Sequence, residues 1–381
     1  MAYVNWCGFE TGDSLEAGTA SGTWSVQNSV KRSGDWALRT NPTTTGTGYF
    51  YFQKYGATGS ATTSFGANNI RVRFYLRIAT LPGSNDECFA AFNSSTTASA
   101  HKLELRLNSS GNILAYNAAG TLVATGTTVL STSTWYMIEA QCGTSATTGT
   151  YTVRINGVQE FTGTTNTSAT QNNAFFLGKV QNRNSQSVDF YYDDLLIKDD
   201  ITAWPGAGKV LRMDPDGDGN YTAWTGDYTA VDDLAAGSAS HDGDSTVITS
   251  NTASQAETCT MESASSAGIQ SYDTVVGVKA LTVAKDSSGT SAYQTRLRSG
   301  TTDSDTTSAN ITSTYFGNGK ILTTDPATGA AWTVSALDSI EVGGVNGTAA
   351  VTTSVTAVCA MVATLDGTPS GGGLLLRGLG S

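Results

Sequence analysis

The chain has 381 residues, of which 42 are glycine and 14% are charged, and its formal net charge is −11. Because single hydrophobic cores stop growing near about 250–300 residues, a chain of this length predicts two domains. Abundant glycine, serine and threonine, with no long stretch of helical periodicity, favour an all-β protein with very little helix and argue against a helical bundle.

The charge is unevenly distributed, since residues 201–381 carry 18 acidic and 8 basic side chains. An acidic surface repels a phosphate backbone, so we expect no nucleic-acid binding. We find no apolar run of eighteen residues and no charged-then-apolar leader, and therefore expect neither a membrane span nor a signal peptide. Five scattered cysteines predict buried thiols in a reducing cytoplasm: Cys7, Cys88, Cys142, Cys259 and Cys359.

Short strands separated by turn residues are predicted through the first half of the chain. They cover residues 1–10, 24–26, 37–40, 48–53, 70–78, 88–92, 102–107 and 122–124. In the stretch 70–78, Arg71, Arg73, Tyr75 and Arg77 alternate with apolar residues. This pattern predicts a strand with one apolar face and one basic, solvent-exposed face.

A β-meander is predicted next, with strands at 135–142, 151–155 and 158–161. Asn156-Gly157 is the dipeptide that favours a type I′ turn, so the last two strands should form a tight hairpin. A final strand of this half is predicted within 187–198, a long apolar and aromatic run that ends in acidic residues.

Several motifs in this order resemble the concanavalin A-like, laminin-G-like jelly roll. They are GFETGD, KRSGDWALR, RVRFYLRI, TWYMIEAQC, TYTVRINGVQEF and DFYYDDLLIKD. The resemblance implies a β-sandwich over residues 1–203. It says little about activity, because this fold carries lectins, hydrolases, adhesion modules and virion proteins.

Residues 204–208 (WPGAG) have the composition of a linker. Alternation at 275–285 and 292–300, with a turn at Ser288-Gly289, predicts antiparallel strands in a second β-sandwich over 209–368. The fold class predicted for the chain is therefore two tandem antiparallel β-sandwich (jelly-roll) domains.

Motifs of the second domain resemble a module found in structural proteins of tailed bacteriophages. They are NYTAW at 220–224, VDD followed by HDGDSTVI with Asp233 in the usual acidic position, VVGVKALTVAKD, and TDPATGAAWTVSALDSIEVGG. The run before Asp233 is shorter than in that module. The resemblance implies a virion protein.

Residues 369–381 form a glycine and leucine tail. Two interpretations remain open. The tail is either a frayed terminus or an arm whose Leu374, Leu375 and Leu376 insert into a neighbouring subunit.

One motif resembles the first half of a calcium loop. Asp214, Asp216, Asp218 and Asn220 place oxygen ligands at alternate positions within a glycine-rich stretch, as a hard cation requires. Thr225 stands where the bidentate glutamate is expected. The alternatives are a calcium site and a solvated turn, and no other cofactor is expected.

A second acidic set, His241-Asp242-Gly243-Asp244, is either half of a zinc or manganese site or a surface turn. The chain has only two histidines and no Cys/His pair at zinc spacing, so a structural zinc site is not expected.

We find no paired acids of the kind that glycosidases place along one strand. Glu104 and Glu139 stand alone, and Asp193-Asp194 are adjacent and should point to opposite faces. The sequence therefore predicts a protein that is not an enzyme.

Glycan binding is the main alternative function, because the stretches 48–55 and 181–192 combine aromatic side chains with Asn and Asp. The same aromatic residues would serve equally well in a sandwich core. Core positions are expected for Trp6, Trp24, Trp135, Tyr151 and Phe190.

Together these patterns predict a structural protein of a tailed-phage virion, assembled in the bacterial cytoplasm. A capsid decoration protein or head fibre is the first interpretation, and a tail-associated, lectin-like receptor-binding protein is the alternative. The expected partners are the major capsid protein or other virion proteins, further copies of the chain, and a host glycan.

Overall fold

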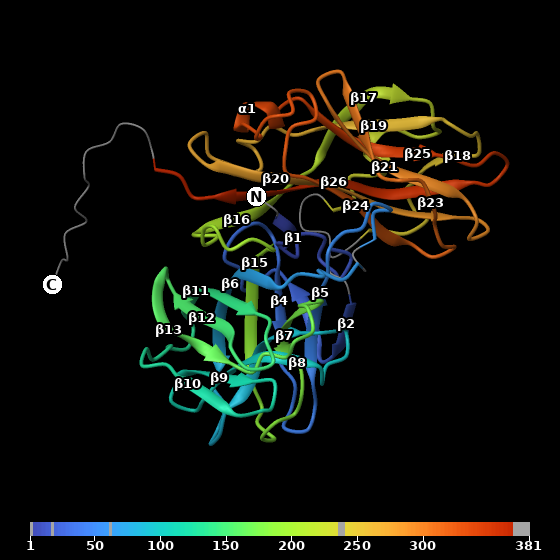
Figure 1. Cartoon of the computed structure of the whole chain (residues 1–381). Coiled ribbons are helices and arrows are strands. Elements are labelled where there is room, and N and C mark those ends of the chain that lie inside the picture. The colour runs from blue at the N-terminus through green and yellow to red at the C-terminus, as the bar shows by residue number, and fades with distance from the viewer. Residues whose placement is uncertain (1–2, 17–18, 61–62, 235–240, 369–381) are drawn as a thin grey trace.

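The computed structural model describes residues 3–16, 19–60, 63–234 and 241–368. Its strands form four antiparallel sheets that are stacked as two β-sandwiches (Figure 1). The predicted fold class, all-β with very little helix, is confirmed. The only helical segments in the described residues are a four-residue α-helix, α1 (Val334–Leu337), and a 3₁₀ turn, η1 (Tyr228–Ala230).

The first sandwich consists of an eight-stranded and a seven-stranded sheet. The eight-stranded sheet has the order β13 (Val158–Thr165), β12 (Gly149–Ile155), β11 (Trp135–Gly143), β6 (Asn69–Thr80), β15 (Asp189–Lys198), β4 (Ala37–Thr40) and β3 (Trp24–Gln27), with β1 (Tyr3–Cys7) also paired to β15. The seven-stranded sheet has the order β10 (Leu122–Thr125), β9 (Ile113–Asn117), β8 (His101–Leu107), β7 (Glu87–Asn93), β14 (Ala174–Lys179), β5 (Gly48–Phe52) and β2 (Thr19–Gly22).

The predicted meander is present as β11, β12 and β13. Asn156 and Gly157 both have positive φ, 50° and 81°, and Ile155 pairs with Val158 across the turn. A type I′ turn requires positive φ at both central residues, so the hairpin follows directly from this dipeptide.

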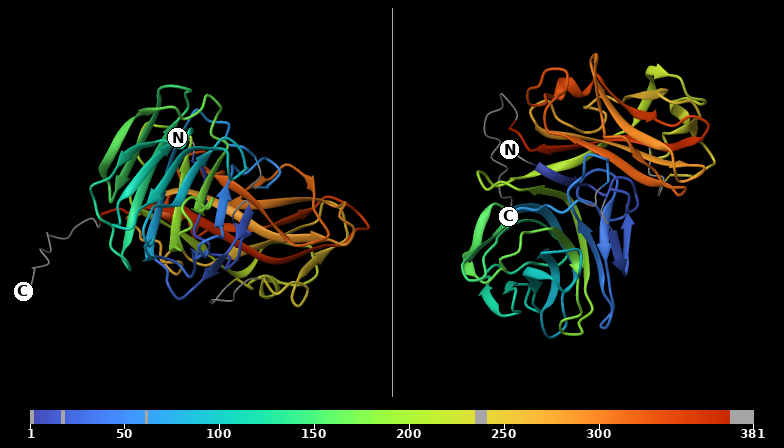
Figure 2. Two further views of the ribbon diagram at one scale, coloured as in Figure 1. Left: turned by 90° about the horizontal axis from the view of Figure 1, so that it is seen from below. Right: turned by 45° about the vertical axis from the view of Figure 1, so that its right-hand side comes forward.

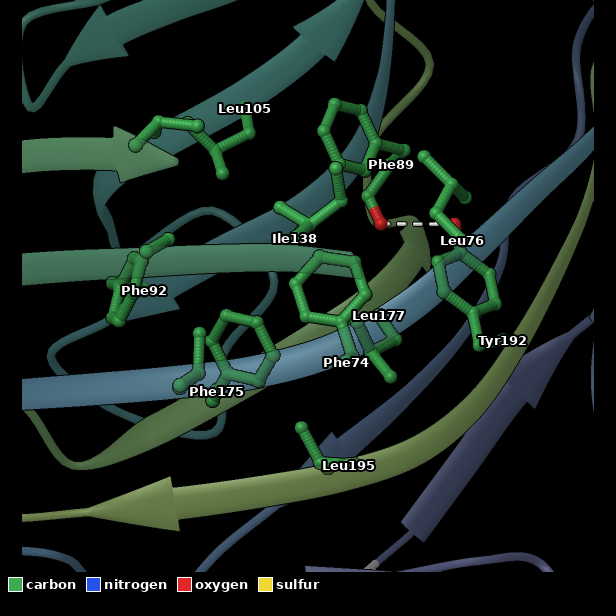
Figure 3. Packing of buried hydrophobic residues seen from close by; sticks show 14 of the residues in the cluster. Phe74, Leu76, Phe89, Phe92, Leu105, Ile138, Phe175, Leu177, Tyr192 and Leu195 are labelled. Atoms are coloured by element: carbon green, nitrogen blue, oxygen red, sulfur yellow. Dashed lines mark hydrogen bonds between the residues drawn. The ribbon is translucent and has the colours of Figure 1, made fainter. Parts of the chain in front are cut away.

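The core of the first sandwich is rich in aromatic side chains from both sheets (Figure 3). Phe74 on β6 lies 5.9 Å from Phe175 on β14, measured between ring centroids. The Tyr192 hydroxyl donates a hydrogen bond to the Phe89 carbonyl at 2.9 Å, so the one polar atom of this ring is satisfied inside the core.

The second sandwich consists of a five-stranded and a six-stranded sheet. The five-stranded sheet has the order β16 (Gly208–Met213), β26 (Thr353–Leu365), β20 (Thr274–Asp286) and β24 (Phe316–Leu322), with β18 (Ile248–Ser250) paired to β26. The six-stranded sheet has the order β17 (Pro215–Thr222), β19 (Ala256–Met261), β25 (Ile340–Asn346), β21 (Ala292–Ser299) and β22 (Thr302–Asp305), with β23 (Ala309–Asn310) paired to β21.

The turn predicted at Ser288-Gly289 is present, and Gly289 has φ 75°. The strands that it joins, β20 and β21, do not pair, because β20 belongs to the five-stranded sheet and β21 to the six-stranded sheet. The turn therefore carries the chain from one layer of the sandwich to the other.

The two sandwiches lie against each other (Figures 1 and 2). They share a buried apolar cluster, which we call the junction. Trp6 of β1 and Leu196 of β15 pack there against Val210, Leu281 and Met361 of the five-stranded sheet. Lys279, on β20, donates a hydrogen bond to the Trp6 carbonyl at 2.7 Å. The contact combines apolar burial with hydrogen bonds across it. The predicted domain limits, 1–203 and 209–368 with a linker at 204–208, stay a prediction.

The junction changes two expectations. Arg73 was expected on a solvent-exposed face of its strand, but its side chain is fully buried, and its Nη1 lies 3.4 Å from the Gly206 carbonyl. The connection after β15 covers this part of β6, which a single strand pattern cannot reveal. Trp6 is buried at the junction, whereas Tyr151 and Phe190 are in the first core as expected, and Trp24 and Trp135 are only partly buried.

All five cysteines are buried and free, as predicted. No helix in the described part of the chain has the length and apolar character to span a bilayer.

Candidate functional site

Three aromatic rings lie together on the outer face of the seven-stranded sheet, and we call them the aromatic strip. Phe50 and Phe52 of β5 point into the core, so the alternation of the strand directs Tyr49 and Tyr51 to the opposite face. The rings of Tyr49 and Tyr51 lie 5.5 and 5.3 Å from that of Phe176 on β14. Phe176 is fully buried, whereas the two tyrosines are half-buried and accessible.

A group of polar side chains lies on the same face, and we call it the charged cluster. It comprises Asp86, His101, Glu104, Arg106, Tyr116 and Arg183. Leu103 and Leu105 point into the core, so the intervening Glu104 and the following Arg106 point outward. Arg183 comes from the connection between β14 and β15.

Glu104 is the centre of the charged cluster. Both of its carboxylate oxygens accept from the Nε of Arg183 at 3.1 Å, and Oε2 also accepts from Arg106 at 3.2 Å. Arg106 contacts Asp86 at 3.2 Å through its other terminal nitrogen, and Tyr116 donates to the second oxygen of Asp86. These contacts hold side chains from two strands, β8 and β9, and from two connections in fixed positions.

The cluster also sets the protonation states on this face. Burial raises the pKa of Glu104, but Arg106 and Arg183 outweigh that effect and hold it below its usual value. Burial lowers the pKa of His101. Burial and the hydrogen bond to Asp86 raise the pKa of Tyr116 to about 12. At neutral pH the cluster therefore has an ionised Glu104, a neutral His101 and a protonated Tyr116.

Sequence reasoning identified part of this site. The stretches 48–55 and 181–192 supply Tyr49, Tyr51 and Arg183, whereas Phe190 and Tyr192 of the same stretches belong to the core. It missed Asp86, His101, Arg106 and Tyr116, and it considered Glu104 only as an isolated acid. The available signal was the alternation in HKLELRL, which places charged residues on one side of a strand.

The stretch predicted as a calcium loop is a strand, β17, and this corrects the expected turn. Its burial alternates, with Asp216, Asp218 and Asn220 on the exposed side. Asp214 pairs with Arg212 at 2.6 Å, and the Asn220 N–H donates to Glu341 at 2.9 Å. The alternate spacing that resembles ligand positions is thus also the period of a β-strand.

These four residues hold separate partners: Asp216 accepts from Thr260 at 2.8 Å and Asp218 accepts from the Tyr228 N–H at 2.9 Å. Across the described residues, the structure places no three His, Cys, Asp or Glu side chains in a group that could hold a metal. Calcium binding by this stretch stays a prediction.

The His241 set lies in a loop of the second sandwich. Asp242 and Asp233 both accept from Thr246, at 3.0 and 3.1 Å, and Asp244 pairs with Lys285 at 2.6 Å. The His241 ring lies 5.1 Å from that of Tyr315. These contacts are those of a structured surface loop.

Glu257 on β19 leads to an expected pH dependence of stability. It is 2% exposed, and burial, with the nearby charge of Asp218, raises its pKa to about 7. In the unfolded chain a glutamate titrates near about 4.3, so the stability present below that pH is lost as the pH rises through about 7. The contribution of Glu257 to the unfolding free energy should fall between pH 5 and 7 by at most about 1.4 kcal/mol per pH unit. We therefore expect the unfolding free energy to fall less over this range in Glu257→Gln than in wild type, as measured by urea denaturation. Glu160→Gln, on the surface of the first sandwich, is the control, and equal slopes in both variants would contradict the expectation.

A polar pocket of about 410 Å³ lies between the two sandwiches, lined by Glu10, Arg32, Asp35, Arg212 and Asp214 among others. Glu10 is 1% exposed, and burial together with the charge of Asp193 raises its pKa well above the usual value. The lining carries both signs of charge but no aromatic ring on which a sugar could stack, so we assign this pocket no function.

No protein-family model matches the chain, and no curated protein matches it in sequence. Solved structures of similar fold include an endo-β-1,4-glucuronan lyase from the fungus Trichoderma reesei, with 12% identity and a TM-score of 0.39 over 52% of this chain and 95% of the lyase. The cellulose-induced protein Cip1 has 16% identity and a TM-score of 0.40 over 51% of this chain and 97% of Cip1. Domain 4 of AbnA, an arabinanase from Geobacillus stearothermophilus solved with arabinotriose, has 15% identity and a TM-score of 0.34 over 51% of this chain and 91% of that domain. These likenesses concern the β-sandwich fold.

The prediction that the chain is not an enzyme is corrected by this comparison, because a polysaccharide lyase is among the structures of similar fold. The prediction rested on the lack of two acids along one strand. The structure brings Asp86, Glu104 and Tyr116 together from the β6–β7 connection, β8 and β9, so acidic side chains meet here without lying along one strand.

Proposed function

We propose that the first sandwich binds a glycan on the outer face of its seven-stranded sheet. The observation that carries this proposal is the placement of two accessible tyrosine rings, Tyr49 and Tyr51, on the same sheet face as the charged cluster. Aromatic rings stack on the apolar face of a sugar, while fixed carboxylate and guanidinium groups accept and donate hydrogen bonds to its hydroxyls.

Preorganisation supports the proposal. The ring of Phe176 packs against the rings of both tyrosines, and Arg183 donates a hydrogen bond to Glu104. Few side chains would therefore need to be ordered when a glycan binds. A binding face of this kind loses less conformational entropy than a flexible one.

We further propose that the chain is part of a tailed-phage particle, either as a receptor-binding protein or as a decoration protein of the capsid. The support is the resemblance of the second half of the chain to a module of phage structural proteins. Immunogold labelling of purified particles with an antibody to the chain should mark the head for a decoration protein and the tail for a receptor-binding protein, and unlabelled particles contradict a virion role.

The glycan proposal is tested on a glycan array with the full chain and with Tyr49→Ala/Tyr51→Ala. Each aromatic contact contributes about 0.5–1.5 kcal/mol, so the double variant should bind its glycan roughly fivefold to 150-fold more weakly. Tyr272→Ala is a matched control, because Tyr272 is an exposed tyrosine of the second sandwich, 39% accessible.

The proposal is contradicted if the wild-type chain binds no glycan, or if the double variant binds as well as wild type. Incubation of the chain with the bound glycan, followed by chromatography of the products, separates binding alone from cleavage.

A further inference from the structure

A second pocket at the edge of the junction differs from the polar one in being mainly apolar. Its volume is about 410 Å³, within the roughly 300–1,000 Å³ of small-ligand sites. Both sandwiches contribute to its lining, which includes Tyr3, Trp204, Val275, Val276 and Leu365.

The cation in the pocket lining is already paired. Lys198, which also lines it, donates to the Ala203 carbonyl at 2.9 Å, pairs with Asp200 at 3.2 Å and lies 5.1 Å from the centre of the Tyr3 ring. Arg71 and Arg154 lie 4.2 and 5.0 Å from the Trp204 ring centre and hold that ring in place. The pocket therefore presents apolar surface without an unpaired cation, and suits an uncharged apolar side chain.

The pocket lies where the described chain ends. Leu365, in its wall, is the last residue of β26, and the description of the chain stops at Thr368. The next thirteen residues, 369–381, lie outside the described residues, and their sequence is PSGGGLLLRGLGS. The leucines of this segment are Leu379 and the three consecutive residues Leu374, Leu375 and Leu376.

Chain length allows these leucines to return to the pocket. The five residues 369–373 span up to about 17 Å when extended, and three of them are glycine. Thr368 is three residues from Leu365, which places it within about 10 Å of the pocket wall. Closing so short a loop costs little entropy, and the effective concentration of a segment tethered in this way is in the millimolar range.

We propose that the apolar pocket at the junction is the binding site of the C-terminal segment of the same chain, which inserts Leu374, Leu375 and Leu376. Tethering favours this occupant over the tail of a second copy at micromolar protein concentrations. The bound segment would cover the apolar surface and bridge the two sandwiches.

The test uses the full chain, a full-length variant Leu374→Ser/Leu375→Ser/Leu376→Ser, and a fluorescent peptide with the sequence of residues 369–381. In anisotropy titrations the serine variant should bind the peptide saturably, because its pocket is vacant. Wild type should bind it at least tenfold more weakly, because its own tail competes.

Ala203→Asp adds a charge to an exposed residue of the pocket wall and should abolish peptide binding when combined with the three serines. Ile201→Asp is the matched control, since Ile201 is exposed and is not part of the wall, and it should leave binding unchanged. A serine variant that does not bind the peptide, or equal affinities of wild type and serine variant, overturns the proposal. Light scattering that shows a wild-type dimer and a monomeric serine variant also overturns it, in favour of the tail of a second copy.

Discussion

Replacement of Trp6 by alanine is expected to lower the free energy of unfolding by about 3–5 kcal/mol, as is usual for truncation of a fully buried aromatic side chain. Trp6 is 0% exposed and lies at the centre of the junction. Its Nε1 donates to the Met361 carbonyl at 3.1 Å, so alanine would leave a cavity and would also remove this hydrogen bond.

The fit of Trp6 to the second sandwich explains the size of this effect. A Cβ added to Gly277 on β20 would lie 2.8 Å from Cη2 of the Trp6 ring, so the ring occupies the space that this glycine leaves open. Trp6 belongs to the first sandwich but packs on the second, and its loss should uncouple their unfolding.

The measurement is urea denaturation followed by circular dichroism, with Trp6→Phe as the conservative variant. Phenylalanine keeps most of the buried area and loses the hydrogen bond, so a smaller loss is expected. The interpretation fails if Trp6→Ala remains within 1 kcal/mol of wild type, or if Trp6→Phe is as destabilised as Trp6→Ala.

Replacement of Asp194 by alanine is expected to lower the free energy of unfolding by a similar amount, about 3–5 kcal/mol. The substitution removes one partner of a buried ion pair and leaves the charge of the other partner uncompensated. The Asp194 side chain is fully buried and accepts from Arg32 at 2.6 Å, from the Ser33 hydroxyl at 2.7 Å and from the Val210 N–H at 2.6 Å. Val210 lies on β16 of the second sandwich, so this carboxylate links the two halves of the chain.

The backbone adds to this cost. Asp194 has φ 53°, where aspartate and asparagine are tolerated better than other residues with a side chain. Asp194→Asn keeps this conformation and one acceptor oxygen, so it should be less destabilised than Asp194→Ala.

The control for Asp194 is Asp189→Ala, which removes a partly exposed pair with Arg39 at 2.7 Å and should cost no more than about 1 kcal/mol. Thermal unfolding of the three variants is the measurement. Equal melting temperatures for Asp194→Ala and Asp189→Ala would show that the buried pair contributes no more than a surface pair.

The candidate site shows why a linear search for catalytic or binding residues fails in a β-sandwich. Glu104 and Arg106 are two residues apart on β8, but their partners Asp86, Tyr116 and Arg183 come from other segments that the sheet order brings together. Single-strand alternation identifies the face on which a residue lies. It contains no information about which strand becomes the neighbour.

The sequence by itself determined what depends on local geometry. The meander of β11 to β13 and the Asn156-Gly157 hairpin follow from two-residue alternation and from the φ values that this dipeptide tolerates. The scarcity of helix and the burial of the cysteines follow from composition and pattern in the same way.

Tertiary structure alone decided what depends on residues far apart in the chain. It buried Arg73 under the connection that follows β15, placed Trp6 against Gly277, and showed that residues 215–222 of the acidic stretch form a strand. It also placed Tyr49, Tyr51 and the charged cluster on one sheet face. The physical reason is that burial and side-chain pairing are set by long-range packing, which a residue's sequence neighbours do not encode.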